Sequence, residues 1–250
     1  MSYLSRSVLV WNDLILGAFV TKVNRFAGTV IVNGVPSYVY ISNPTLTSEL
    51  LKCGTPVLMQ RHPRGKKTAF RLIAAKRGKI WATLDTAIPN LVFREAVRRA
   101  AIKEFSSYRI IGENVRFGRS LIDFLLVRGR KLAYVEVKSC TLVEKGIAKF
   151  PDAVTKRGLR HLRELEEAVK KGNEAYMVWV IQRPDAKLLV SFWEKDPEFS
   201  RELIRAERVG VSLLAYKCHF DGHHLTLLSK VPVVPTEDRQ NHAGNAFYVT

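Results

Sequence analysis

The stretch IDFLLVRGRKLAYVEVKSCTL, residues 122–142, decides how the C-terminal part of this chain folds. Two runs rich in apolar residues flank a short turn that contains Gly129, which predicts an antiparallel hairpin of strands 122–127 and 132–139. An ordinary buried hairpin would carry no charge, yet these strands contain Asp123, Glu136 and Lys138. Because burying a charge without a partner is costly, the three side chains need an explanation.

Strand geometry brings the three charges together. Side chains alternate across a strand, so Glu136 and Lys138 project to the same face. A hairpin that turns at Gly129 also places Asp123, at the start of the first strand, beside the end of the second. Two adjacent carboxylates repel each other unless a cation lies between them, and oxygen ligands favour Mg²⁺ or Mn²⁺. We therefore predict Asp123 and Glu136 as metal ligands, with Lys138 orienting or deprotonating a water that attacks a phosphodiester.

The spacing alone leaves a second interpretation open, because Asp, Glu and Lys on a hairpin can also form a cross-strand salt bridge on an exposed face. The following segment, FPDAVTKRGLRHL at 150–162, favours the metal site. It gathers Thr155, Lys156, Arg157, Arg160 and His161 at the start of a predicted helix, and a helix N-terminus with basic side chains binds anions. We expect Thr155 and Arg157 to contact the scissile phosphate.

The charge of the chain indicates a polyanionic partner. Its 40 Lys and Arg against 23 Asp and Glu give a formal net charge of +17, with most of the excess before residue 85. The segment 61–79 has eight basic residues and no acidic one, which favours a stripe along a phosphate backbone over a merely solvated surface. The predicted nucleic-acid-binding residues are Arg25, Arg61, Arg64, Lys66, Lys67, Arg71, Lys76, Arg77, Thr155, Arg157 and Arg160.

The sequence pattern divides the chain into two parts. Residues 1–84 show short strands broken by turns, including the hairpin signal Asn33-Gly34, and predict a small β-barrel of the oligonucleotide-binding (OB) type. Phe26, Tyr38 and Tyr40 could stack on bases there or only fill the barrel. Residues 85–230 mix helices and strands, and 231–250 is expected to form a tail. The predicted class is therefore α/β (α+β): a barrel followed by a mixed α/β domain.

Start and stop signals outline the second domain. Pro89 opens one helix, Asp152 is the expected cap of a second helix that ends at Gly172, and Asp196, Pro197 and Gly210 frame a third. The run AYMVWVIQR is apolar enough to be a strand covered on both faces and hence central. Further strands are predicted at 113–118, 213–220 and 224–230.

Several classes of protein are excluded or disfavoured. No apolar run approaches the roughly 18 residues that span a bilayer, so we expect no membrane partner and a cytoplasmic location. Three cysteines without a CxxC pair predict neither disulfides nor a zinc finger. The histidines of CHFDGHHL, residues 218–225, fit a hairpin turn better than a zinc site.

The run from Ile122 to Leu165, with YMVWVIQR after it, resembles the sugar fermentation stimulation protein A (SfsA) family, and the likeness extends from Asn90 to about Tyr216. The resemblance implies an N-terminal OB barrel, a C-terminal domain similar to the PD-(D/E)XK nucleases, and DNA binding. It places Asp123, Glu136 and Lys138 on the nuclease motif and Gln182 at the position of a supporting glutamine. Glu95 would match an additional acidic residue of such sites.

The sequence departs from that family at two places. Leu121 stands where the family pattern has a basic residue beside the site, and Arg119 could replace it only if the backbone bends. The loop YISNPTLTSEL, residues 40–50, lacks the family's His-x-Pro-Asn-Thr-Gly pattern. Both departures affect substrate recognition more than the metal site.

The sequence thus predicts a DNA-binding protein with a nuclease-like domain that hydrolyses phosphodiesters with Mg²⁺ or Mn²⁺. The alternative is a non-catalytic DNA-binding or regulatory protein with a silent metal site, and RNA is a further possible partner. The sequence fixes neither strandedness nor oligomeric state, and a homodimer is compatible with it.

Overall fold

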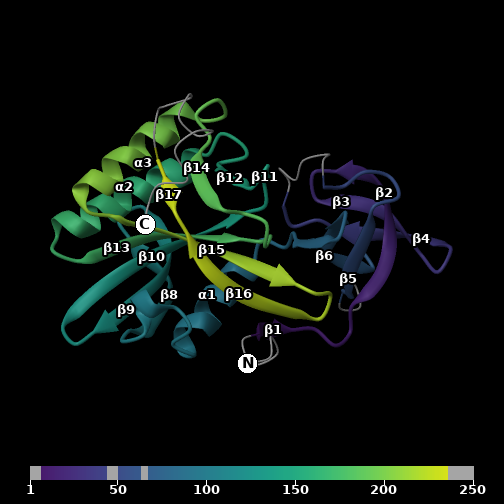
Figure 1. The fold of residues 1–250 in the computed structure, drawn as a ribbon, viewed down its shortest axis with the longest axis horizontal. Coiled ribbons are helices and arrows are strands. Elements are labelled where there is room, and N and C mark those ends of the chain that lie inside the picture. Colours follow the sequence, from purple (N-terminus) through teal and green to yellow (C-terminus); the bar gives the residue numbers. More distant parts are fainter. Residues whose placement is uncertain (1–6, 44–49, 63–66, 236–250) are drawn as a thin grey trace.

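A computed structural model describes residues 7–43, 50–62 and 67–235, which form two lobes joined side by side (Figure 1). The smaller lobe is a barrel made from the N-terminal third of the chain. The larger lobe is a twisted sheet with helices on both faces. None of the helices in these ranges is long and apolar enough to cross a membrane.

The barrel closes through five strands. β2 pairs with β3 and β5, β3 with β4, β5 with β6, and β4 closes the ring by a parallel pairing with β6. Asn33 and Gly34 both have positive φ at the predicted β3–β4 turn, as a two-residue hairpin requires. This order is that of the predicted OB barrel. The bounds are β2 Ile15–Asn24, β3 Ala27–Val32, β4 Val35–Tyr40, β5 Pro56–Arg61 and β6 Phe70–Arg77.

Two short strands join the barrel segment to the larger lobe. β7 (Ile80–Thr83) continues from β6 and pairs with β15 through Trp81 and Phe220. β1 (Ser7–Val10) pairs with β16 instead of with a barrel strand. The prediction that assigned all of residues 1–84 to the barrel was therefore wrong for β1, because its apolar residues Val8 and Leu9 pack against the core of the larger lobe.

The larger lobe centres on β13, which pairs in parallel with both β10 and β15. Antiparallel β9 and β8 extend one side of the sheet, and antiparallel β16 covers the other. Nearly every residue of β13 is buried, which confirms the predicted central strand. The bounds are β8 Arg109–Phe117, β9 Ser120–Arg128, β10 Lys131–Cys140, β13 Glu174–Ile181, β15 Ser212–Phe220 and β16 His224–Val231.

Helices cover both faces of this sheet. α1 (Ile88–Arg98) packs on one face, followed by the short 3-10 helix η2 (Lys103–Phe105). α2 (Lys156–Lys170) and α3 (Pro197–Val209) lie on the other face and connect the parallel strands β10, β13 and β15 (Figure 1). Such crossovers are how parallel neighbours are joined.

The cap of α2 differs from the expectation. Thr155, not Asp152, is its N-cap, and the Thr155 hydroxyl accepts the Gly158 N–H at 3.0 Å. Asp and Thr are both good caps, so composition alone could not rank the two positions. The predicted ends of α3 are confirmed: Asp196 is the cap, Pro197 opens the helix, and Gly210 ends it with φ of 115°.

A small second sheet lies beside α2 and α3. It consists of β11 (Val143–Glu144), β12 (Ile147–Phe150), β14 (Leu188–Ser191) and β17 (Val233–Val234). β17 pairs with β14, and β16 ends only at Val231, so the first residues of the predicted tail 231–250 belong to the fold. Residues 236–250 of that tail lie outside the described ranges.

Three apolar clusters fill the described part of the molecule. One lies inside the barrel around Phe19, Val30 and Met59. The second lies between the sheet and α1, and the third between the sheet and the pair α2 and α3. β10 contributes to both clusters of the larger lobe, with Val135 and Val137 on the α1 face. Glu136 and Lys138, which alternate with them, therefore face α2.

Asp196 ties the two helices of one face together, since its buried carboxylate accepts the N–H groups of Phe199 at 3.0 Å and Thr155 at 2.8 Å. Asp196→Ala leaves both donors without a partner, and we expect the free energy of unfolding to fall by about 2–4 kcal/mol. Urea denaturation measures this change.

The control is Glu198→Ala, in the first turn of the same helix, whose side chain is 64% exposed. We expect this change to stay within about 0.5 kcal/mol. Equal losses for the two variants would show that the Asp196 contacts do not hold α2 and α3.

Candidate active site on β9 and β10

Asp123 lies where the pairing of β9 with β10 ends. The last aligned pair is Val135 and Phe124, and Asp123 is the next residue beyond it. Its Oδ2 accepts the backbone N–H of Val137 at 2.8 Å, a bond that a strand neighbour would otherwise take. Its Oδ1 accepts the side-chain amide of Asn90 on α1 at 3.0 Å. The carboxylate is therefore fixed from both sides at the end of the paired strands.

Glu136 is the most enclosed of the predicted site residues on this hairpin, at 2% exposure. Lys138 Nζ lies 2.5 Å from Glu136 Oε1, and the ring Nδ1 of His161 on α2 contacts the same oxygen. Two donors thus converge on one carboxylate oxygen, and strand alternation has placed Glu136 and Lys138 on one side as expected.

The other oxygen of Glu136 has no hydrogen-bond partner within the described part of the chain, although it is buried. A buried carboxylate oxygen without a donor or a cation is unfavourable by roughly 1–3 kcal/mol or more. This unpartnered Oε2 is the feature of the site that calls for a ligand.

The two acids differ in their readiness to lose a proton. Burial raises the pKa of Asp123, and the nearby charge of Glu136 raises it further. Burial acts in the same direction on Glu136, but the Lys138 ammonium and the His161 hydrogen bond outweigh it, so the pKa of Glu136 is lowered. Glu136 therefore loses its proton more readily than Asp123, and such a separation of pKa values is expected when two close carboxylates share one site.

The start of α2 contributes three contacts. Arg157 Nε donates to His161 Nε2 at 3.3 Å, and Arg160 Nε donates to Ser120 Oγ at 3.2 Å. Both arginines are exposed, so their remaining N–H groups can reach a phosphate. The hydroxyl of Thr155, expected to contact a phosphate, instead caps the helix.

Gln182 lies away from the acidic pair. Its amide oxygen accepts the Thr83 hydroxyl at 2.5 Å and its amide nitrogen donates to Ser139 Oγ at 2.6 Å. Within the described ranges no hydrogen bond joins it to Asp123, Glu136 or Lys138. The register places Gln182 beyond Cys140, so its contact with the site strands is to Ser139, the neighbour of Lys138, and its role as a supporting glutamine stays a prediction. Gln182 connects β7 to β10.

The helical acid expected at the site is also elsewhere. Glu95 pairs with Arg98 at 3.3 Å and Arg99 at 3.8 Å along α1, whereas Asn90, in the first turn, contacts Asp123. Asn90 and His161 are the two contacts that sequence reasoning did not assign. The signal for His161 was present, since one helical turn separates it from Arg157.

The predicted basic stripe at 61–79 divides into two groups. Arg61 and Lys67 lie near the start of β6, whereas Lys76 and Arg77 lie at its end, about 20 Å away. The residues in the middle of β6 are mostly buried and separate the two groups. Arg71, expected to bind a phosphate, forms a two-contact ion pair with buried Asp85.

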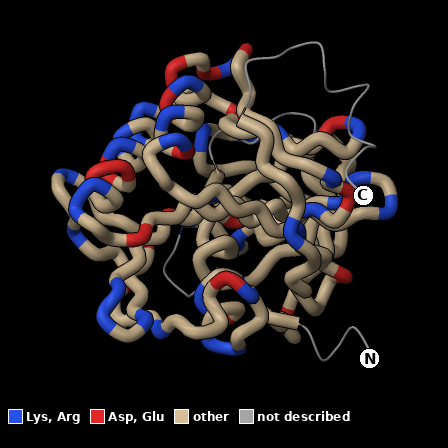
Figure 2. Tube along the Cα trace, turned by 60° about the vertical axis from the view of Figure 1, so that its left-hand side comes forward, with Lys and Arg blue, Asp and Glu red and all other residues tan. Residues whose placement is uncertain are grey.

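Two other basic residues predicted to bind nucleic acid lie beside aromatic rings. Arg25 is exposed and stacks 5.6 Å from the Phe26 ring centroid, and Lys76 lies 5.5 Å from the Trp81 ring. Arg64 and Lys66 lie outside the described residues. Lys and Arg are spread over both lobes, with Asp and Glu among them, so the net charge is not confined to one face (Figure 2).

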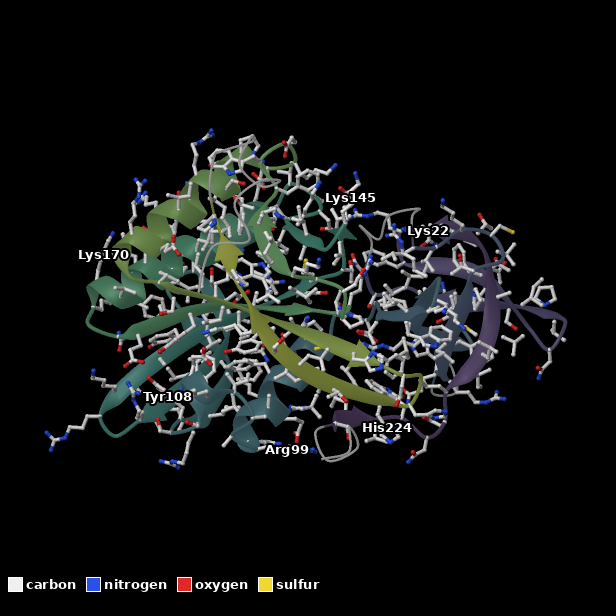
Figure 3. The ribbon with its side chains drawn as sticks, viewed as in Figure 1. Lys22, Arg99, Tyr108, Lys145, Lys170 and His224 are labelled. Atoms are coloured by element: carbon white, nitrogen blue, oxygen red, sulfur yellow. The ribbon has the colours of Figure 1, made fainter. Side chains whose placement is uncertain are left out.

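No group of three or more His, Cys, Asp or Glu suited to a metal occurs in the described ranges. The turn of CHFDGHHL is closed by Asp221, whose Oδ1 accepts the N–H groups of His223 and His224. His224 lies at the tip of the β15–β16 hairpin, far from the site strands (Figure 3). A metal at Asp123 and Glu136 would therefore have two protein carboxylates, and waters would complete its shell.

Two family models match the chain along these two lobes. Residues 20–84 match the SfsA N-terminal OB domain, and residues 87–224 match the sugar fermentation stimulation protein RE domain. The chain belongs to the sugar fermentation stimulation protein family. The resemblance stated from the hairpin and α2 is thereby confirmed.

Relatives within the family cover nearly the whole chain. The sugar fermentation stimulation protein homolog of Caldanaerobacter subterraneus subsp. tengcongensis is 36% identical over 91% of this chain and all of its own length. That of Methanothermobacter thermautotrophicus is 35% identical over 85% of this chain and 89% of its own. The structure of Pyrococcus furiosus SfsA, solved in complex with Ca²⁺, is 24% identical with a TM-score of 0.86, over 91% of this chain and 99% of that one. The two-lobed fold is thus that of an SfsA protein.

At one departure from the SfsA pattern, a basic residue from another element lies beside the site. Leu121 is exposed, and Arg119 uses its backbone N–H to bind Glu164. Arg160 reaches Ser120 from α2 instead, so a guanidinium still lies beside β9. The second departure falls largely on residues 44–49, which lie outside the described ranges.

Gln182→Ala tests the assignment of Gln182 to the junction between the lobes. Removing the amide leaves the buried Thr83 hydroxyl and Ser139 without their partner, and we expect the free energy of unfolding to fall by about 1–3 kcal/mol. Gln60→Ala, which loses only 3.4–3.5 Å contacts to Asp13 at the surface, is the control. Chemical denaturation that gave no difference between the two variants would contradict the assignment.

Proposed function

We propose that this protein binds DNA and that its C-terminal domain hydrolyses phosphodiester bonds with Mg²⁺ or Mn²⁺ held by Asp123 and Glu136. The observation that carries the proposal is the buried, unpartnered Oε2 of Glu136 beside a second carboxylate and a lysine. Both carboxylate oxygens of a buried salt bridge are usually satisfied, so the free Oε2 favours a cation over a purely structural pair.

The donor set fits a hard divalent cation. Mg²⁺ keeps several waters and is commonly bound by one or two carboxylates together with substrate phosphate oxygens. Asp123 and Glu136 supply those carboxylates from adjacent strands. Burial and, after it, their mutual repulsion raise the pKa of Asp123, and a cation would relieve that repulsion. Ca²⁺, the ion named for the Pyrococcus furiosus relative, prefers the same kind of ligand.

Each residue then has a definite task. When bound, the cation would polarise the phosphate and lower the pKa of a coordinated water. Asn90 and the Val137 N–H hold Asp123 in place, and Lys138, whose side chain is 15% exposed, can hold a water by its ammonium group. Arg157 and Arg160, on the exposed start of α2, can neutralise the phosphates on either side of the scissile bond.

The barrel supports the binding part of the proposal. Arg25, Arg61 and Lys67 are exposed, and the rings of Phe26 and Tyr38 are 46% and 56% exposed. Charged groups bind the backbone and exposed rings stack on bases. Lys145, on the C-terminal lobe, lies on the side that faces the barrel, and Lys22 lies on the barrel itself (Figure 3).

The catalytic part is tested by incubating the protein with labelled single-stranded and double-stranded DNA and RNA in Mg²⁺ or Mn²⁺. Glu136→Ala and Lys138→Ala should reduce cleavage at least about 100-fold, because one removes a ligand and the other the water-holding group. Chelation of the cation should abolish cleavage by the native protein. Gel analysis of the products measures the rate.

Glu95→Gln is the matched control, since Glu95 faces Arg98 and Arg99 and does not touch Asp123. It should cleave like the native protein. If the native protein cleaves nothing, or if Glu136→Ala cleaves equally well, the protein is a binding protein with a silent site.

The binding part is tested by the dependence of DNA affinity on salt. Arg61→Gln/Lys67→Gln removes two exposed charges at one end of the barrel. The slope of log affinity against log salt should then fall by about 0.9 for each lost phosphate contact to duplex DNA. Lys170→Gln is the control, because Lys170 already pairs with Glu167 at 2.6 Å on α2. A slope unchanged in the double variant would exclude this end of the barrel from the binding surface.

A further inference from the structure

A chain of hydrogen bonds runs from the exposed start of α2 to the buried carboxylate of Glu136. Arg157 Nε donates to His161 Nε2, and the opposite ring nitrogen of His161 contacts Glu136 Oε1. His161 is 1% exposed, so the histidine reaches no solvent and is satisfied entirely by these two partners. The chain therefore links a surface arginine to the metal-binding pair through one ring.

The partners of the ring fix which nitrogen carries the proton. Arginine can only donate, so Nε2 must accept and has no hydrogen. Nδ1 then carries the hydrogen and donates it to Glu136 Oε1. With one nitrogen donating to Glu136 and the other accepting from Arg157, His161 has no free lone pair and cannot itself be a metal ligand.

The hydrogen bond from His161 helps to fix the orientation of the Glu136 carboxylate. His161 and Lys138 both approach Oε1, so the carboxylate cannot rotate without losing two donors. Oε2 stays free of protein partners. We propose that His161 is a positioning residue that fixes Glu136 with Oε2 directed at a divalent cation, and that Arg157 holds His161 in the tautomer this requires. This inference rests on the proposed function, because it concerns the same metal-binding pair.

The arrangement also couples the metal site to the nucleic acid. Among the ion pairs of the described residues none involves Arg157, and its side chain is exposed. A phosphate that binds its outer N–H groups would hold the guanidinium in the orientation in which Nε reaches His161. Phosphate binding and cation binding should then strengthen each other, since such coupling is reciprocal.

A purely structural role for His161 makes a different prediction. In that case the ring would only satisfy a buried charge, and its removal would lower stability without a specific effect on cation affinity. In metal sites, partners that orient a ligand typically change metal affinity by about 10–100-fold when they are removed. Cation affinity measured without nucleic acid therefore separates the two roles, independently of catalysis.

The experiment titrates Mn²⁺ into the native protein and into His161→Leu and His161→Asn by calorimetry, with thermal unfolding of each protein recorded beside it. His161→Leu removes the donor and should weaken Mn²⁺ binding by about 10–100-fold. His161→Asn keeps an N–H donor at the position of Nδ1 and should recover much of the affinity. It also serves as the folded variant if the leucine substitution does not fold.

Arg157→Gln is compared with Arg160→Gln, the neighbouring arginine of the same turn, which bonds to Ser120 instead of His161. Removing a positive charge should by Coulomb's law alone strengthen the binding of a cation. Arg160→Gln should follow that rule, with unchanged or tighter Mn²⁺ binding. Arg157→Gln should bind Mn²⁺ more weakly, because His161 loses the bond that fixes its tautomer.

The outcomes distinguish the inference from the function on which it rests. If the native protein binds no Mn²⁺, the proposed metal site is wrong and the inference falls with it. If the native protein binds Mn²⁺ and folded His161→Leu binds it equally well, or folded His161→Asn binds it about 10–100-fold more weakly than the native protein, only the inference is overturned. Equal behaviour of Arg157→Gln and Arg160→Gln would remove Arg157 from it.

Discussion

The charge of Glu136, buried in the middle of a sheet, is the constraint on which the larger lobe depends. Taking one carboxylate out of water costs on the order of several kcal/mol, and the cost must be offset where the charge lies. Lys138 offsets part of it from the same strand, but His161 can do so only if α2 packs on this face. α2 in turn is held by Thr155 and Asp196 at its start and by Leu162 and Leu165 in the apolar cluster beneath it. The crossover from β10 to β13 thus places the helix and satisfies the charge at once.

Asp123 solves a related problem in the backbone. Where β9 and β10 cease to pair, the N–H of Val137 would lose its partner, and the Asp123 carboxylate takes that place. A group that completes the sheet in this way is held as rigidly as the sheet itself. Both acids are therefore positioned by secondary structure and not by loops, and rigid support of this kind keeps a catalytic geometry within narrow limits.

The sequence predicted those parts of the fold that depend on local pattern. Alternation gave the hairpin with Glu136 and Lys138 on one face, Asn33-Gly34 gave a barrel turn, and Asp196, Pro197 and Gly210 gave both ends of α3. It failed where a residue's partner comes from a distant segment. Arg71 looked like a free cation because nothing local shows that Asp85 is buried beside it. The contacts of Gln182 and His161 also come from distant segments. Only the register of β13 shows that Gln182 bonds to Ser139, and only the packing of α2 shows that His161 contacts Glu136.

The junction between the lobes fixes the position of the barrel relative to Asp123 and Glu136. The barrel strands continue through β7 into the main sheet, β1 pairs with β16, and buried Thr83 and Gln182 connect β7 to Ser139, the neighbour of Lys138. If a flexible linker alone joined the two lobes, the barrel could hold a nucleic acid at one place while the larger lobe reached its backbone at many different positions. Here the shared sheet fixes the barrel relative to the acidic pair, so a strand bound on the barrel would approach the site in one orientation. Under the proposed function, Gln182 would affect where the nucleic acid lies, and His161 would affect the orientation of the Glu136 carboxylate toward the cation.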